Sequence, residues 1–206
     1  MKNKKLLSDI KEYLKYYENQ VLEDWYELIR HISVSETGEG IETCCDWIQK
    51  KMEEIGIQVT KYSVKPAPVL VGRFGNDPEK KTVLIYAHYD VKPAGERKLW
   101  HSDPFVPTVR DGKVYARGSA DNKSPLMAHL KALEYFIRRK MEVPVNVIFV
   151  FEGDEECGSR GLEEFLAEHR TELAADLVFF SDGPKDPSGL LWGQREICLF
   201  ILQLKR

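Results

Sequence analysis

The stretch VNVIFVFEGDEECGS, residues 145–159, carries the two features that decide the fold and the site: an apolar run and a cluster of acids. An apolar run of this length is typical of a strand that is buried on both faces of a sheet. Similar runs are TVLIYA at 82–87 and DLVFF at 176–180. Because these runs alternate with helical segments, they predict an α/β fold with three layers, in which a mainly parallel sheet is flanked by helices.

The helical segments have apolar residues at spacings of three and four. This pattern predicts helices over 4–33, 41–55, 124–140 and about 159–169. Between the first two helices and TVLIYA, the segments IQVTKYSV and VLVGRF have a β pattern instead. Asp111-Gly112 separates two short strand segments, 105–109 and 113–115, and is a strong hairpin signal.

The composition is that of an ordinary globular chain. It has 206 residues, of which 43% are hydrophobic, and a formal net charge of −3. This charge gives no electrostatic reason to expect binding to nucleic acid or to an anionic membrane surface. No apolar segment has the length of a transmembrane helix, and the N-terminal segment lacks the pattern of a secretory signal. Four cysteines in a chain of this length make no disulfide framework, so we expect a reduced, cytoplasmic protein.

Candidate metal ligands follow four of the predicted strand segments. They are His88 and Asp90 after TVLIYA, Asp121 after KVYARG (113–118), Glu155 and Glu156 after VNVIFVF, and Asp182 after LVFFS. The carboxyl ends of strands in an open α/β sheet meet at a common crevice, so we expect these side chains to lie together. A single acid at a strand end is usually a helix cap or a solvated turn. The metal hypothesis therefore depends on all of them occurring together.

Carboxylates gathered in this way would repel one another without a cation, and imidazole and carboxylate ligands suit Zn²⁺, Mn²⁺ or Co²⁺. His88 and Asp90 are two residues apart and point the same way in an extended chain, which suits Asp90 to orient the imidazole. Glu155 and Glu156 are adjacent and point in different directions. One of them can therefore bind metal while the other moves protons.

A nucleotide-binding α/β protein is an alternative, but neither GxGxxG nor GxxxxGK[ST] occurs in the chain. Gly38 and Gly40 do not complete such a fingerprint, because position 43 is Thr. Asp103 and Asp111 are better interpreted as turn formers than as ligands.

Four segments resemble the successive motifs of the M20 metallopeptidases, the group of aminoacylase and carboxypeptidase G2. They are LIYAHYDVKP, LWHSDPFVPTVRDGKVYARGSADNKSPLMAHLKALE, FEGDEECGS and FFSDGP, in this order. The second segment is most similar to the dipeptidase branch that includes the carnosine dipeptidases. The resemblance covers about residues 10–205 and implies a zinc-peptidase-like catalytic domain.

The resemblance also implies two divalent metal ions that share a bridging aspartate, with zinc expected and manganese or cobalt as alternatives. His88, Asp121 and Asp182 match the ligands of one metal, and Asp121 and Glu156 match two ligands of the other. Glu155 matches the general base, and Asp90 matches the partner of the first histidine. The implied substrates are dipeptides or N-acyl amino acids, with no nucleic acid or membrane partner.

By the same resemblance, residues 1–186 correspond to the N-terminal part of the catalytic domain. Residues 187–206 correspond to a linker and the first strand, ICLFILQL, of a lid and dimerisation domain through which a homodimer is expected. The family's last ligand is a histidine beyond this point, and the last histidine here is His169. Position 124 is Ser where the family usually has Gly.

We therefore expect an M20 dipeptidase-like amide hydrolase that is impaired as this chain, because the second metal keeps only two protein ligands. One alternative is a deacylase of the acetylornithine deacetylase or succinyl-diaminopimelate desuccinylase type. Another is an inactive fragment that acts only as a metal-binding or interaction module.

Overall fold

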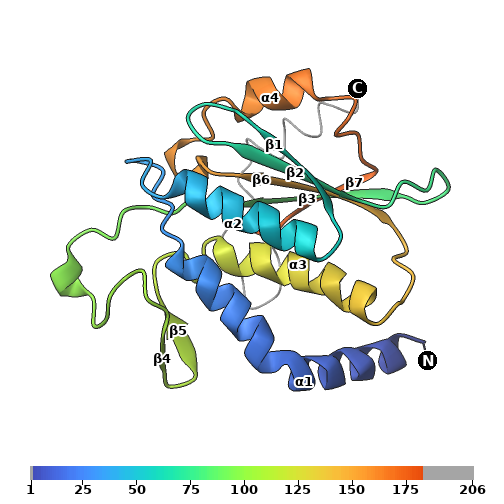
Figure 1. Ribbon diagram of the computed structural model, residues 1–206, viewed down its shortest axis with the longest axis horizontal. Helices are drawn as coiled ribbons and strands as arrows, with labels where there is room; N and C mark the ends of the chain where they lie inside the picture. The colour runs from blue at the N-terminus through green and yellow to red at the C-terminus, as the bar shows by residue number, and fades with distance from the viewer. Residues whose placement is uncertain (1, 183–206) are drawn as a thin grey trace.

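The computed structural model describes residues 2–182. Its centre is a five-stranded sheet with the strand order β1-β2-β6-β3-β7 (Figure 1). The strands of this sheet are β1 (Gln58–Tyr62), β2 (Val69–Phe74), β3 (Thr82–His88), β6 (Asn146–Glu152) and β7 (Leu177–Phe180). The α-helices are α1 (Lys2–Arg30), α2 (Ile41–Glu54), α3 (Lys123–Arg138) and α4 (Leu162–Glu168).

The prediction of a mainly parallel sheet is confirmed, with one exception. Strand β3 pairs in parallel with both β6 and β7. Strand β2 pairs antiparallel with both β1 and β6. Four of the five strands therefore run in one direction, and β2 alone runs in the other.

Helices cover both faces of the sheet, as the apolar runs predicted (Figure 1). Phe149 and Phe151 of β6 belong to a core cluster with buried residues of α2 and α3. Ile148 and Val150, which alternate with them, belong to a second cluster with buried residues of α4. All seven residues of β6 are buried. The absence of polar alternation in VNVIFVF thus follows from its place between two helical layers.

The helix boundaries differ from the predicted ones by a few residues. Helix α1 ends at Arg30 and not at 33, and α4 begins at Leu162 and not near 159. A short 3-10 helix, η2 (Glu155–Cys157), lies between β6 and α4 and carries the glutamate pair. Helix α3 begins one residue before Ser124, so the turn that contains Asp121 leads directly into it.

The strand-end argument for Asp121 is wrong, because the strand in KVYARG does not belong to the central sheet. Lys113–Tyr115 form β5, which pairs with β4 (Thr108–Arg110) in a separate two-stranded sheet. This strand is only three residues long and has no buried residue, so it has no apolar surface with which to enter a core. The hairpin itself is confirmed, because Asp111 and Gly112 have positive φ angles of 49° and 69° between paired Arg110 and Lys113.

The predicted linker after Asp182, the boundary at 186 and the strand at 197–204 lie outside the described residues. Within residues 2–182, no helix is long and apolar enough to cross a membrane.

Gly153, between β6 and η2, packs against Tyr89, and a substitution here tests how rigid that packing is. A Cβ atom at this position would lie 2.5 Å from Cζ and from the hydroxyl oxygen of Tyr89. Tyr89 is fully buried and donates a hydrogen bond to the Pro68 carbonyl at 2.7 Å, so its ring has no room to move. We expect Gly153→Ala to lower the free energy of unfolding by about 1–3 kcal/mol in urea titrations.

Gly72→Ala is the matched control, because its Cβ would meet mainly the terminal methyl of Met52, the end of a flexible side chain. We expect a smaller loss there. A loss at Gly72 that equals or exceeds the loss at Gly153 would contradict the rigid-ring argument.

Candidate metal centre

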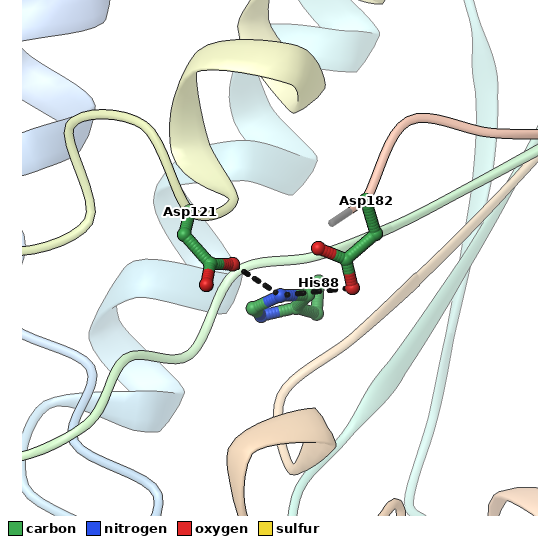
Figure 2. A group of neighbouring side chains, drawn as sticks. All are labelled: His88, Asp121 and Asp182. Atoms are coloured by element: carbon green, nitrogen blue, oxygen red, sulfur yellow. Dashed lines mark hydrogen bonds and ion pairs between the residues drawn. The ribbon is translucent and has the colours of Figure 1, made fainter. Parts of the chain in front are cut away.

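Three side chains meet where the carboxyl ends of β3 and β7 approach the start of α3 (Figure 2). His88 is the last residue of β3, Asp182 follows β7, and Asp121 precedes α3. Each offers one ligand atom, and these atoms all lie within 4.8 Å of one another. The His88 Nε2 atom is 3.0 Å from Asp121 Oδ1 and 3.6 Å from Asp182 Oδ2.

These distances fit a single divalent cation. Ligand bonds of 2.0–2.1 Å in tetrahedral geometry place the ligand atoms about 3.3 Å apart. One imidazole nitrogen and two carboxylate oxygens also form a donor set that suits Zn²⁺, Mn²⁺ or Co²⁺. His88 is fully buried and 64% of the Asp121 side chain is exposed, so the group opens to solvent on the aspartate side.

Asp90 contacts both His88 and the start of η2. It is fully buried, and its Oδ1 atom lies 3.2 Å from Nδ1 of His88. The two oxygens of its carboxylate also accept the backbone N–H groups of Glu155 and Glu156, at 3.1 and 3.0 Å. Nδ1 of His88 also forms a hydrogen bond with the backbone carbonyl oxygen of Asp90, at 3.1 Å. Asp90 thus turns Nε2 of the imidazole toward the other acids, and its carboxylate fixes the start of η2.

The charges around His88 are strongly coupled. Burial opposes a charge on the imidazole, but its contacts with Asp121 and Asp90 outweigh this and raise the pKa of His88 well above its usual range. The hydrogen bond with His88 in turn lowers the pKa of Asp121. Without a metal, the imidazolium therefore partly compensates the gathered carboxylates, a role that a divalent cation would take over.

Glu155 lies at the edge of this group with the properties of a proton-transfer residue. Its side chain is 8% exposed, and its Oε2 atom is 3.7 Å from Nε2 of His88. Burial raises the pKa of Glu155 to about 7. A carboxyl group that titrates near neutrality can both accept and donate a proton.

The side chain of Glu156 has a different partner from that of Glu155. It is 10% exposed, and its Oε2 atom lies 2.8 Å from the ammonium nitrogen of Lys92. Of the six predicted site residues, the structure brings His88, Asp121 and Asp182 into one ligand group and places Asp90 and Glu155 against His88. The carboxylate of Glu156 is paired with Lys92.

Two residues that follow Asp121 were not among the predicted site residues. Asn122 is 1% exposed and donates a hydrogen bond from Nδ2 to the carbonyl oxygen of Ser181, at 3.0 Å, which joins the segments that carry Asp121 and Asp182. Lys123 is equally buried, and its ammonium donates to the carbonyl oxygens of Leu28 and His31 at the end of α1. Both are polar residues at a helix start, a pattern typical of solvated caps, so their burial could not be predicted from the sequence.

A third unpredicted residue, Glu152, lies at the end of β6. It is 2% exposed, accepts hydrogen bonds from the hydroxyl groups of Tyr86 and Ser159, and its pKa is raised to about 7 by burial. Its place directly after the apolar run was the available signal, because the last residue of a doubly covered strand is buried with the strand.

Solved structures share this arrangement of elements. Human carnosine dipeptidase 1 superposes with a TM-score of 0.82 at 29% identity, covering 86% of this chain and 41% of that one. The M20 family metallo-carboxypeptidase Sso-CP2 of Sulfolobus solfataricus superposes with a TM-score of 0.77 at 36% identity, covering 82% of this chain and 38% of the other.

Among curated proteins, the Cys-Gly metallodipeptidase of Schizosaccharomyces pombe is 42% identical over 165 residues, which are 75% of this chain and 34% of that protein. The Beta-Ala-His dipeptidase of Mus musculus is 38% identical over 143 residues, 67% of this chain and 29% of that protein. The chain thus spans about a third of the length of these relatives.

The model of peptidase family M20/M25/M40 matches residues 84–192, a stretch that begins in β3 just before His88 and includes Asp121, the glutamate pair and Asp182. This match covers more than half of the chain and all three side chains of the candidate ligand group. With the fold and the sequence relatives in agreement, we conclude that the chain belongs to peptidase family M20/M25/M40.

Proposed function

We propose that this chain is part of a metal-dependent hydrolase that cleaves the amide bond of dipeptides or N-acyl amino acids. The observation that carries the proposal is the meeting of His88, Asp121 and Asp182 from three separate elements, with ligand atoms within 4.8 Å of one another. The names of the sequence relatives, Cys-Gly and Beta-Ala-His dipeptidase, support small peptides as the substrate class.

The metal content is part of the proposal. We assign two divalent cations, with zinc as the metal, of which the first would be held by His88, Asp121 and Asp182. Asp121 and Glu156 would contribute to the second. Cations at paired sites of this kind lower the pKa of water and stabilise the oxyanion that forms during amide hydrolysis.

Proton transfer and the orientation of the ligand histidine are assigned to side chains of this chain. Glu155 is the proposed general base: its carboxylate accepts a proton from the attacking water and delivers it to the leaving amine. Its 8% exposure keeps bulk water from competing for that proton. Asp90 acts through His88, because its contact with Nδ1 leaves Nε2 as the ring nitrogen that faces the ligand group.

The organisation of the whole protein is proposed in the same terms. Residues 1–186 would form the N-terminal part of a catalytic domain, and 187–206 a linker and the first strand of a lid domain that supports a homodimer. We place the protein in the cytoplasm, without nucleic-acid or membrane partners.

Titration calorimetry of the metal-free 206-residue chain with Zn²⁺ tests the proposal. We expect one tight site and a second site at least about tenfold weaker, because this chain supplies three protein ligands to the first site and two to the second. Dipeptide hydrolysis by the same sample should be weak. Absence of any tight site would overturn the metallohydrolase proposal, while two equally tight sites or rapid turnover would overturn the ligand assignment.

A further inference from the structure

Lys92 forms an ion pair with a carboxylate that the proposed function assigns to metal. Its ammonium nitrogen lies 2.8 Å from Oε2 of Glu156. Lys92 lies on the loop after β3, which also carries Asp90. The carboxylate of Asp90 accepts a hydrogen bond from the backbone N–H of Glu156. The charge of Lys92 also interacts with Glu155 and Asp121.

The two partners of this ion pair differ in their freedom to move. The backbone of Glu156 is fixed by Asp90, and its side chain is 10% exposed. The side chain of Lys92 is 61% exposed, so its ammonium can move into solvent at little cost. Displacement of Lys92 therefore requires no rearrangement of η2.

Lys123 shows how a permanently held lysine differs in this fold. It is 1% exposed, and its ammonium donates to two backbone carbonyl oxygens of the α1 end, at 3.1 and 2.6 Å. Lys92 is not buried in this way, and within the part of the chain that the structure describes its ammonium is hydrogen-bonded to the Glu156 carboxylate. The geometry of Lys92 is that of a cation that can be exchanged.

We propose that Lys92 is an internal counter-cation of the second metal position: its ammonium pairs with Glu156 until a second divalent cation displaces it. Lys92 thereby weakens the second site further, beyond the effect of its smaller number of protein ligands. The inference rests on the proposed function, because Glu156 is a metal ligand only within it. The competition is for a carboxylate oxygen and requires no covalent step.

Calorimetric titration of Lys92→Met with Zn²⁺ tests this inference, because methionine keeps an unbranched side chain and removes the charge. We expect the dissociation constant of the second site to fall about three- to tenfold, the range for a partly exposed ion pair with a charged partner. The affinity of the first site should stay within about twofold. Lys92→Arg, which keeps the charge, should keep the dissociation constant of the second site close to that of the original chain.

Lys98→Met is the matched control, because Lys98 is 79% exposed and pairs with Glu96 at 2.7 Å in the short helix η1 (Arg97–Leu99) of the same long loop. It should leave both sites unchanged. A second site that is unaffected by Lys92→Met, or equal gains at both sites or in the Lys98 variant, would overturn the inference. Failure of the original chain to bind any Zn²⁺ tightly would overturn the proposed function instead, so the two failures are distinguishable.

Discussion

Asp121→Ala is expected to weaken zinc binding by at least about 100-fold, while Glu155→Ala leaves the first site nearly intact. Asp121 supplies a carboxylate oxygen 3.0 Å from the ligand nitrogen of His88 and is assigned to both proposed metals. Loss of a residue that only supports a ligand already costs 10–100-fold in metal affinity, so loss of a shared ligand costs at least the upper end of that range. Glu155 is assigned to proton transfer and not to metal.

The measurement is titration calorimetry on both variants, with urea unfolding to check that each is folded. The Asp121 side chain is 64% exposed, so its removal leaves no buried cavity, and the fold should tolerate it. Asp103→Ala is a matched control, because Asp103 is also an exposed aspartate and pairs with Arg97 at 3.1 Å. The reverse order of effects, with Glu155 essential for zinc and Asp121 dispensable, would overturn the roles assigned to the two residues.

The sheet could be predicted from the sequence because its inner strands are covered on both faces. The run at 145–151 has no polar alternation for a physical reason: adjacent residues such as Ile148 and Phe149 contact different helical layers. The direction of β2 could not be predicted in the same way. Strand polarity depends on which edge the chain enters after a turn, and the pattern of VLVGRF is compatible with either direction.

The sequence indicated that His88, Asp121 and Asp182 would lie close together, but not the geometry in which they do so. His88 and Asp182 follow strands of the central sheet, as the strand-end rule requires. Asp121 reaches the same place from the start of α3, because the strand that precedes it, β5, lies in a separate hairpin. The sequence also gave no sign that the peptide bond between Asp121 and Asn122 is cis, or that Glu156 pairs with Lys92. The Glu156–Lys92 ion pair depends on the final packing of segments that are distant in sequence.

Asp90→Asn should weaken both zinc binding and folding, because one buried carboxylate accepts two backbone N–H groups and also lies 3.2 Å from Nδ1 of His88. An amide at this position loses the charge that faces Nδ1 of His88, and one of its ends can no longer accept a hydrogen bond from the N–H of Glu155 or Glu156. We expect zinc affinity to fall about 10–100-fold and the free energy of unfolding, measured in urea with a chelator, to fall by about 1–3 kcal/mol.

Asp154→Asn separates these two effects, because Asp154 is also a buried acid next to η2 but contacts Arg160 and not His88. It is 3% exposed, and its carboxylate accepts hydrogen bonds from the guanidinium and the backbone N–H of Arg160. We expect this variant to lose stability while its first zinc site stays within about twofold. If it lost zinc affinity as strongly as Asp90→Asn, the effect of Asp90 would have to be transmitted through the turn. A selective loss in Asp90→Asn instead places its contribution at the imidazole of His88.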